Sequence, residues 1–334
     1  VQNVTSSGHG VGVHFRSGSM TDAKVLNSTL NGNGFGVRVA SAVTNMDGML
    51  IDGCTMNNNN SSAISVNPSG TLTNINTNYT ISNSTFANNS TAGVANQHDL
   101  SFFGFYGNAS LSNVTLTSGN GTTANSNSYG IVFTRGSGSG PLGNVSLSNV
   151  TVNGFVGKGA LSFQKYSDIS GVSLNNVSLN NCVAPWGSLI LDHTDADQFA
   201  VGNTTLRSIV LWNAGGADAT SASYYHATSN TLLDRNVLAN CFQMEDQTVH
   251  KVDVSLLGLV RVKAGELFVT TNSFAAPTTT TASIQRAVDA ASSSDAIHVS
   301  AGTFIEDVNV NKTLSLIGSG SGSTTLSGAI GGDA

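Results

Sequence analysis

The chain has 334 residues and a formal net charge of −6, and only 10% of its residues are charged whereas 39% are hydrophobic. The negative charge and the lack of a Lys/Arg cluster with interleaved aromatic residues argue against a nucleic-acid partner. No apolar run approaches the roughly 18 residues that span a bilayer, so we expect no membrane insertion. The hydrophobic residues recur periodically, which favours a packed, charge-poor repeat protein over a disordered chain.

A short signature recurs along residues 1–215: an apolar residue, any residue, and then Asn-x-Ser/Thr, usually followed by another apolar residue. Successive signatures are 24 to 36 residues apart. A step of this size is typical of a solenoid, in which each repeat buries its apolar face only against its neighbours. The signature asparagines are Asn3, Asn27, Asn83, Asn113, Asn149, Asn176 and Asn203, and Gly53 takes the position in a variant copy.

The residues around each signature alternate between apolar and polar side chains, as expected of a β-strand with one buried face. Residues 145–152 and 172–179 illustrate the alternation, and a second strand-like segment follows in every repeat, for example residues 160–163. Runs of Gly, Asn and Ser separate the strands and supply the positive φ angles that sharp corners need. Short strands in every repeat, with no helix between them, predict a parallel β-helix rod of about eight coils over residues 1–215.

The signature asparagines have two interpretations. Asn-x-Ser/Thr is an acceptor for N-glycosylation. Alternatively, Asn tolerates a left-handed backbone at a bend, and amide side chains at equivalent positions of stacked coils hydrogen-bond to one another. Because the motif follows the structural period, we predict that the seven asparagines form a ladder along the rod.

The densest acidic group in the rod consists of Asp192, Asp195 and Asp197. Strand alternation would place Asp195 and Asp197 on one face, where their hard oxygen ligands would suit Ca²⁺. A solvated loop at the end of the rod accounts for the same residues and is the interpretation that we favour. Calcium is the one cofactor that the sequence allows, and no other metal or cofactor site is predicted.

The repeat is lost after residue 215. Residues 216–280 carry much of the local charge and no regular signature, and we expect them to form a junction segment. Residues 281–334 open with a helical pattern that has one apolar face, so we expect a short helix with Thr281 as its N-cap. The apolar positions of this helix are Ile284, Ala287, Val288 and Ala291, and the elements expected after it are strands over residues 295–299, 308–310 and 314–317 with a turn at 301–303.

The C-terminal part resembles a known family. The opening of right-handed parallel β-helix proteins of the pectin-lyase-like superfamily is similar to Ser283-Ile-Gln-Arg-Ala-Val-Asp-Ala-Ala291, Ala301-Gly-Thr-Phe304 and Asn311-Lys-Thr-Leu-Ser-Leu-Ile-Gly318. The resemblance implies that the helix caps the end of a rod and that residues 281–334 include the first coils of a next unit. Residues 1–213 resemble the rod, and residues 244–269 resemble the junction between units of very large secreted bacterial repeat proteins. The expected fold is all-β, a right-handed parallel β-helix solenoid with a short capping helix near the C-terminus.

Many proteins of this superfamily cleave acidic polysaccharides, so a polysaccharide lyase or glycoside hydrolase acting on acidic glycans is the alternative function. Gly8-His9-Gly10 matches an element of polygalacturonases and Arg261-Val-Lys263 resembles another, but they lie much further apart here than in that family. The family's aspartate motifs, which supply the acid and base of inverting hydrolysis, have no counterpart. The arginine base of pectate lyases also has none. We therefore predict no catalytic residues.

The order of these parts is that of one period of a longer array, because the opening of one β-helix follows the body of another. If copies are placed head to tail, the spacing from Asn311 to the next Asn3 stays within the observed range of steps. Open strand edges promote association. We therefore expect a structural or adhesive repeat unit of an extracellular filament, sheath or giant cell-surface protein, with copies of itself as partners and polysaccharide as a further candidate. The residues expected at the joint are Val1, Asn3, Val11, Val13, Leu326 and Ile330.

Overall fold

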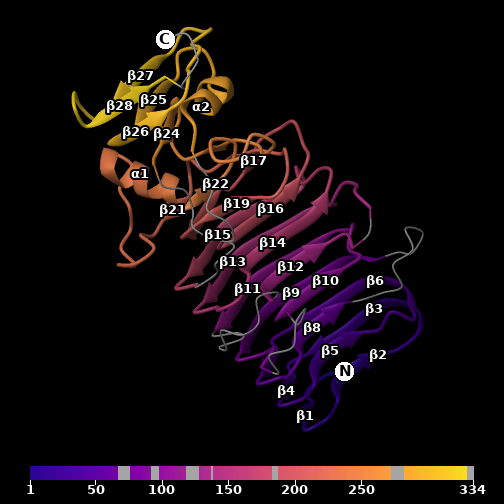
Figure 1. Cartoon of the computed structure of the whole chain (residues 1–334). Helices are drawn as coiled ribbons and strands as arrows, with labels where there is room; N and C mark the ends of the chain where they lie inside the picture. Colours follow the sequence, from indigo (N-terminus) through magenta and orange to yellow (C-terminus); the bar gives the residue numbers. More distant parts are fainter. Residues whose placement is uncertain are drawn as a thin grey trace.

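The computed structural model describes residues 1–66, 76–91, 98–117, 128–136, 138–182, 187–271 and 282–328. These residues build an elongated stack of short strands, with the N-terminus at one end and the C-terminus at the other (Figure 1). Strands that are neighbours in the two large sheets come from successive repeats of the sequence and pair in parallel. The stack is a parallel β-helix solenoid, which confirms the predicted all-β fold class.

The largest sheet contains eleven strands. Equivalent positions of successive signatures lie side by side in it, because Leu111 pairs with Leu147 and Leu147 pairs with Leu174. In the longer strands the signature asparagine lies at a bend within the strand, so that one strand contributes to two faces of its coil. The strands are β1 (Thr5–Ser7), β3 (Gly18–Leu26), β4 (Thr29–Asn31), β6 (Val43–Asp52), β7 (Thr55–Asn57), β9 (Asn76–Ala87), β11 (Ala109–Thr117), β13 (Val145–Asn153), β15 (Val172–Asn180), β18 (Asn203–Leu206) and β21 (Ser223–Tyr224).

The second sheet contains nine strands and closes the other side of the rod. Its inward side chains include stacked phenylalanines: the ring centroids of Phe102 and Phe133 are 4.5 Å apart, and those of Phe133 and Phe163 are 5.4 Å apart. Since side chains alternate along a strand, the residues next to these phenylalanines in the sequence, such as Ser101 and Val132, face outward. The strands are β2 (Val11–Phe15), β5 (Phe35–Val39), β8 (Ser62–Val66), β10 (Leu100–Phe103), β12 (Tyr129–Thr134), β14 (Gly159–Tyr166), β16 (Leu189–His193), β19 (Ile209–Leu211) and β22 (Thr248–Val249).

The stack extends past residue 215. A third, three-stranded sheet joins β17 (Phe199–Ala200), β20 (Ala217–Asp218) and β23 (Val260–Arg261). Together with β21 and β22, these strands carry the coil register into residues 216–280, and one hydrophobic core runs from Val13 to Phe268. Helix α1 (Leu238–Asp246) lies against β22 and against β24 (Glu266–Val269) at this end of the rod.

The C-terminal part forms a second, smaller stack. It consists of the parallel sheet β24 (Glu266–Val269), β25 (Ala296–Val299) and β27 (Ser315–Gly318) and of the pair β26 (Gly302–Ile305) and β28 (Thr324–Ser327). Helix α2 (Ile284–Ala290) packs its predicted apolar face, with Ile284, Ala287 and Val288, into a core of its own beside Val299.

Three details of this region differ from expectation. The N-cap of α2 is Ser283, whose hydroxyl accepts the Arg286 N–H at 3.2 Å, whereas Thr281 lies outside the described residues. Residues 302–305 are a strand rather than a turn, because β26 pairs with β28 and buries Phe304. Residues 308–310 do not form a strand, and the side chain of Val310 is exposed there.

Candidate functional sites

The signature asparagines occupy a column of left-handed corners. Asn83, Asn113, Asn149 and Asn176 have φ between 50° and 55°. Each amide nitrogen donates to the amide oxygen of the preceding coil: Asn113 to Asn83 at 3.0 Å, Asn149 to Asn113 at 3.0 Å, and Asn176 to Asn149 at 2.8 Å. The first of the four, Asn83, donates to Asp52 at 2.8 Å. Four expected ladder positions thus form one continuous hydrogen-bonded chain on the rod surface.

The other three expected ladder positions lie outside this hydrogen-bonded chain. Asn3 and Asn27 are left-handed, with φ of 57° and 47°. The next coil has Gly53, which offers no side chain, and a Cβ there would approach Asn27 Oδ1 to 2.5 Å. At the far end the pairing register shifts next to Asn203, and Gly202 takes the left-handed conformation with φ of 66°. Glycine therefore replaces asparagine where the amide column is interrupted.

A second asparagine ladder lies inside the rod and was not predicted. The amide oxygen of Asn59 accepts the Asn33 N–H at 3.0 Å, and the amide oxygen of Asn89 accepts the Asn59 N–H at 3.1 Å. All three side chains are at most 1% exposed. Each lies six residues after a signature position. The repeat step that aligns the signatures could therefore also have predicted this second ladder. In later coils the buried side chains of Phe155 and Cys182 follow the left-handed corner instead.

The acidic group of the rod does not form a calcium cage. Strand β16 ends at His193, so strand alternation does not extend to Asp195 and Asp197. Asp192 Oδ2 accepts the Lys165 N–H at 3.1 Å, and Asp195 Oδ2 accepts the Ile169 N–H at 2.8 Å. Asp197 is exposed. Two of the carboxylates thus anchor the backbone of the preceding coil, and the three do not converge on one point.

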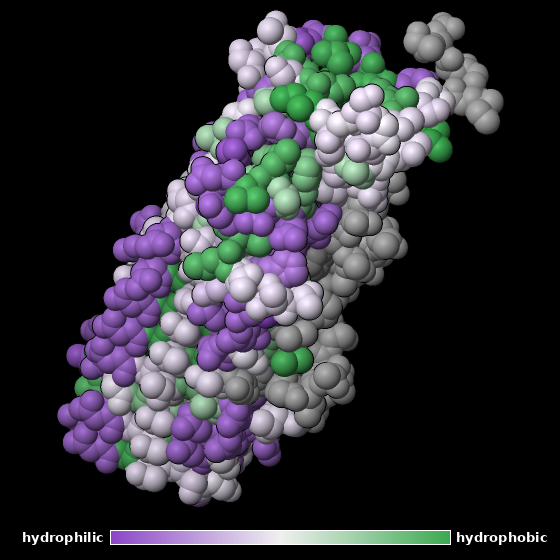
Figure 2. Space-filling view, turned by 90° about the vertical axis from the view of Figure 1, so that its left-hand side faces the viewer, coloured by the Kyte–Doolittle hydropathy of each residue, from purple (hydrophilic) through white to green (hydrophobic). Residues whose placement is uncertain are grey.

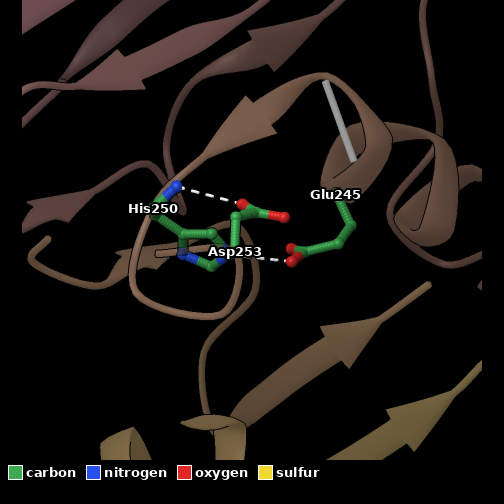
Figure 3. A group of neighbouring side chains, drawn as sticks. All are labelled: Glu245, His250 and Asp253. Carbon is green, nitrogen blue, oxygen red and sulfur yellow. Dashed lines mark hydrogen bonds and ion pairs between the residues drawn. The ribbon is translucent and has the colours of Figure 1, made fainter. Parts of the chain in front are cut away.

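In the described part of the chain, one set of three His, Cys, Asp or Glu side chains brings its ligand atoms within 4.8 Å of one another: Glu245, His250 and Asp253 (Figure 3). All three are buried. His250 Nε2 lies 2.7 Å from Glu245 Oε1, and Asp253 Oδ2 accepts the His250 backbone N–H at 3.1 Å. Sequence reasoning missed this set because its members lie in the segment without a repeat.

The hydrogen bonds of His250 assign its ring proton. The Val260 N–H donates to Nδ1 at 3.0 Å, so Nδ1 is an acceptor and Nε2 carries the proton that it donates to Glu245. A cation would have to replace that proton. These hydrogen bonds link three elements: helix α1, the turn that follows β22, and strand β23. Burial raises the pKa of Asp253 to about 6, against the opposing effect of His250.

A groove with a volume of about 460 Å³ lies on the outer face of the nine-stranded sheet. The aromatic rings of Tyr129 and Trp212 lie beside the same ammonium group, since Lys158 Nζ is 5.9 Å from the Tyr129 centroid and 4.9 Å from the Trp212 centroid. The outward residues of β8, β10, β12 and β14 form its floor. The lining residues are Ser65, His98, Ser101, Phe103, Tyr129, Val132, Thr134, Lys158, Gln164, Lys165 and Trp212.

The described lining of this groove has cationic side chains and no aspartate or glutamate. Burial, with a smaller effect of Lys158, lowers the pKa of His98 to about 4, so its ring is neutral at neutral pH. Burial raises the pKa of Tyr129 to about 12. The charge of the lining at neutral pH therefore comes from Lys158 and Lys165, although burial lowers the pKa of Lys158 from its usual value.

The residues expected at a head-to-tail joint lie at the ends of the stack wherever the structure describes them. Val1 and Asn3 are exposed, whereas Val11 is half-buried and Val13 is buried in the first coil. At the other end Leu326 is exposed on β28, and Ile330 lies outside the described residues.

No protein-family model matches the chain, and neither a curated protein nor a solved structure shows significant similarity to it. In the described residues, no helix is long and apolar enough to cross a lipid bilayer.

Proposed function

We propose that this chain is a structural or adhesive unit of an extracellular filament, sheath or giant cell-surface protein, joined head to tail to further β-helix coils. The observation that carries the proposal is the open edge at each end of the stack. Among the described strands, β1 has β4 as its one sheet neighbour and β27 has β25. Each of these strands therefore has one edge to which a further parallel strand can be added, and such edges promote association.

Apolar side chains accompany both edges. Val1 is 54% exposed at one end, and Ile317 and Leu326 are 43% and 46% exposed at the other. Figure 2 shows hydrophobic side chains gathered at the end of the rod that carries the C-terminal stack. Covering apolar surface with a following coil contributes roughly 25 cal/mol per Å². The following coil belongs either to the same polypeptide or to a separate subunit, and a heterologous joint of this kind propagates into a filament.

Sedimentation velocity and negative-stain electron microscopy over a range of concentrations test the proposal. We expect linear assemblies of the purified chain, and we expect Ile317→Lys to abolish them because it places a charge on the edge of β27. Leu256→Lys is the matched control, since Leu256 is exposed on the turn before β23 and away from both edges. A wild-type chain that remains monomeric at every concentration would overturn joining between separate subunits, and an Ile317→Lys variant that assembles like wild type would overturn the assignment of the joint to β27.

A further inference from the structure

The last coil of the C-terminal stack has inward side chains that no other described residue covers. Leu267 and Ile297 are neighbours in adjacent strands, and both are buried. Leu316 takes the next position in the same column, yet it is 40% exposed. In the other strand pair Phe304 is buried, whereas Leu326, which lies beside it, is 46% exposed. Among the described residues, each column therefore lacks the member that a further coil contributes.

A pocket with a volume of about 370 Å³ lies between these uncovered side chains. Its lining includes Ile284, Val299, Leu316, Gly318 and Leu326. Ile284 and Val299 belong to the buried core of the C-terminal stack, so the pocket is an open end of that core. Removing apolar surface from water contributes roughly 25 cal/mol per Å². The pocket therefore fits apolar side chains that are carried by a further coil.

The occupant of the pocket has to present two parallel strands in a fixed order. β27 is followed after a short turn by β28, and each has a free edge among the described strands. The same holds for β1 and β2 at the opposite end of the molecule (Figure 1). Both ends belong to stacks of parallel strands, so β1 can extend the sheet of β27 while β2 extends the pair of β26 and β28.

The first coil also has inward side chains at its free edge. The Val4 N–H donates to Ser28 Oγ at 3.2 Å, so Val4 lies beside a buried position of the following coil. Val4 itself is 40% exposed. Ser6 pairs with the buried Leu30, which places it on the inward face of β1. The first coil thus presents a larger and then a smaller inward side chain, two residues apart.

The two ends of the molecule have opposite net charge. Residues 1–26 carry two basic residues and one aspartate, whereas residues 302–328 carry two acidic residues and one lysine. Opposite charge favours contact between unlike ends over contact between like ends. A second copy of the chain therefore matches the pocket in strand order, apolar surface and charge.

From these matches we infer that the pocket is closed by the first coil of a second copy, with β1 beside β27 and β2 beside β28. The inference rests on the proposed head-to-tail assembly and specifies which residues meet. Leu316 lies beside Val4 of the second copy, and Gly318 lies beside its Ser6. In this register a large inward side chain adjoins a large one and a small residue adjoins a small one, so both interior columns continue across the joint.

Disulfide cross-linking of the full-length chain tests this register. Ile317 and Thr5 of the second copy are then neighbours whose side chains point away from the core, with Cα atoms roughly 4.8 Å apart. That separation suits a disulfide. We expect Ile317→Cys and Thr5→Cys, mixed and oxidised, to give a covalent dimer on a non-reducing gel. The native cysteines are buried and should not contribute.

Ser7→Cys is the matched control, because residue 7 lies on the same strand and two residues out of register. Its Cα is roughly 8 Å from that of residue 317, which is too far for a disulfide, and we expect at least about tenfold less cross-linking. Without any added cysteine, Val4→Asp should prevent assembly because it places a carboxylate in the apolar pocket. Val237→Asp should not, since Val237 is an exposed valine outside β1, β2, β27 and β28.

Sedimentation velocity separates the failure of this inference from that of the proposed function. The inference is overturned, and head-to-tail assembly stands, if the chain assembles but Ile317→Cys links to Ser7→Cys as efficiently as to Thr5→Cys, or links to neither. It is also overturned if Val4→Asp assembles like Val237→Asp. A wild-type chain that remains monomeric contradicts both the joining of separate subunits and this inference.

Discussion

The amide nitrogen of Asn59 donates to Asn89 Oδ1 over 2.9 Å, which joins two fully buried side chains that are 30 residues apart in the sequence. The same Asn59 amide also donates to the Leu30 carbonyl oxygen at 3.0 Å. These groups have no access to water, so their partners must come from adjacent coils. A slip of one residue between coils would leave buried amides without partners. The inner ladder, formed by the buried Asn33, Asn59 and Asn89, therefore fixes the register of three coils.

Removing the middle of this ladder should be costly. Asn59→Ala leaves the buried Asn33 N–H without its acceptor and removes the amide donor to the Leu30 carbonyl and to Asn89 Oδ1, although Asn89 Oδ1 keeps the backbone N–H of residue 59. We expect the free energy of unfolding to fall by about 2–4 kcal/mol. Urea denaturation followed by circular dichroism measures the change. Asn60→Ala is the neighbouring control, because Asn60 is exposed and its loss should change stability by about 0.5 kcal/mol or less. Equal losses for both variants would contradict a buried ladder that fixes register.

The outer ladder is the surface column of Asn83, Asn113, Asn149 and Asn176. In it, the contribution of the left-handed backbone to stability can be measured separately from that of the amide hydrogen bonds. Asn113 has φ of 53° and both donates to and accepts from ladder neighbours. Asn113→Gly removes the amide bonds and keeps the left-handed corner relaxed, whereas Asn113→Ala also strains that corner. We expect Ala to be less stable than Gly by about 1 kcal/mol in thermal or urea unfolding. If Ala were as stable as Gly, the left-handed conformation would not be what selects asparagine here.

Asp99 should make the stability of the rod depend on pH. It is buried, and its Oδ1 has no hydrogen-bond partner among the described residues. Burial raises its pKa to about 7, although a hydrogen bond from Ser90 opposes the shift. A carboxyl group whose pKa is raised by folding stabilises the protonated fold, so its contribution is fully present below the pKa of the unfolded chain and is lost as pH rises through about 7.

The variant Asp99→Asn tests this dependence, because its amide cannot ionise. We expect wild type to lose about 2 kcal/mol more stability than Asp99→Asn between about pH 5 and about pH 8. Denaturant titrations of both proteins at the two pH values measure the difference. The raised pKa of Asp253 acts in the same direction, but it is present in both proteins and cancels. Parallel pH profiles for the two proteins would show that Asp99 is not responsible.

The three cysteines should be unreactive in the folded protein. Cys54, Cys182 and Cys241 are free and buried. Burial raises the pKa of all three thiols, that of Cys182 to about 12, so little of the reactive thiolate forms at neutral pH. A thiol reagent added to the native protein should label none of them, and all three should react in denaturant. Rapid labelling of the native protein would indicate that the coils open more readily than their packing implies.

The sequence predicted the residues that recur at a fixed step, such as the signature asparagines. It did not predict the sites that are formed by unrelated residues of different coils. Asn113 and Asn149 could be aligned from their signatures alone, because a fixed step stacks equivalent residues. Lys158, Tyr129 and Trp212 belong to different coils and to no common motif, so nothing in their spacing indicated that they share a groove. Glu245 and His250 lie in the aperiodic segment, where local pattern says little about tertiary contacts. The buried position of Asn59 could have been predicted, because Asn59 and Asn89 are as far apart in the sequence as Gly53 and Asn83.

Unequal lengths of chain separate the corners of the outer ladder. Asn83 and Asn113 are 30 residues apart, Asn113 and Asn149 are 36 apart, and Asn149 and Asn176 are 27 apart, yet the hydrogen bonds that join them all measure 2.8 to 3.0 Å. The number of residues between two corners therefore does not set the distance between them. Connecting segments of this kind tolerate insertions and deletions far better than the elements they link. The rod can gain or lose surface residues between coils, and so acquire new surface features, without any change in the distance between its two ends.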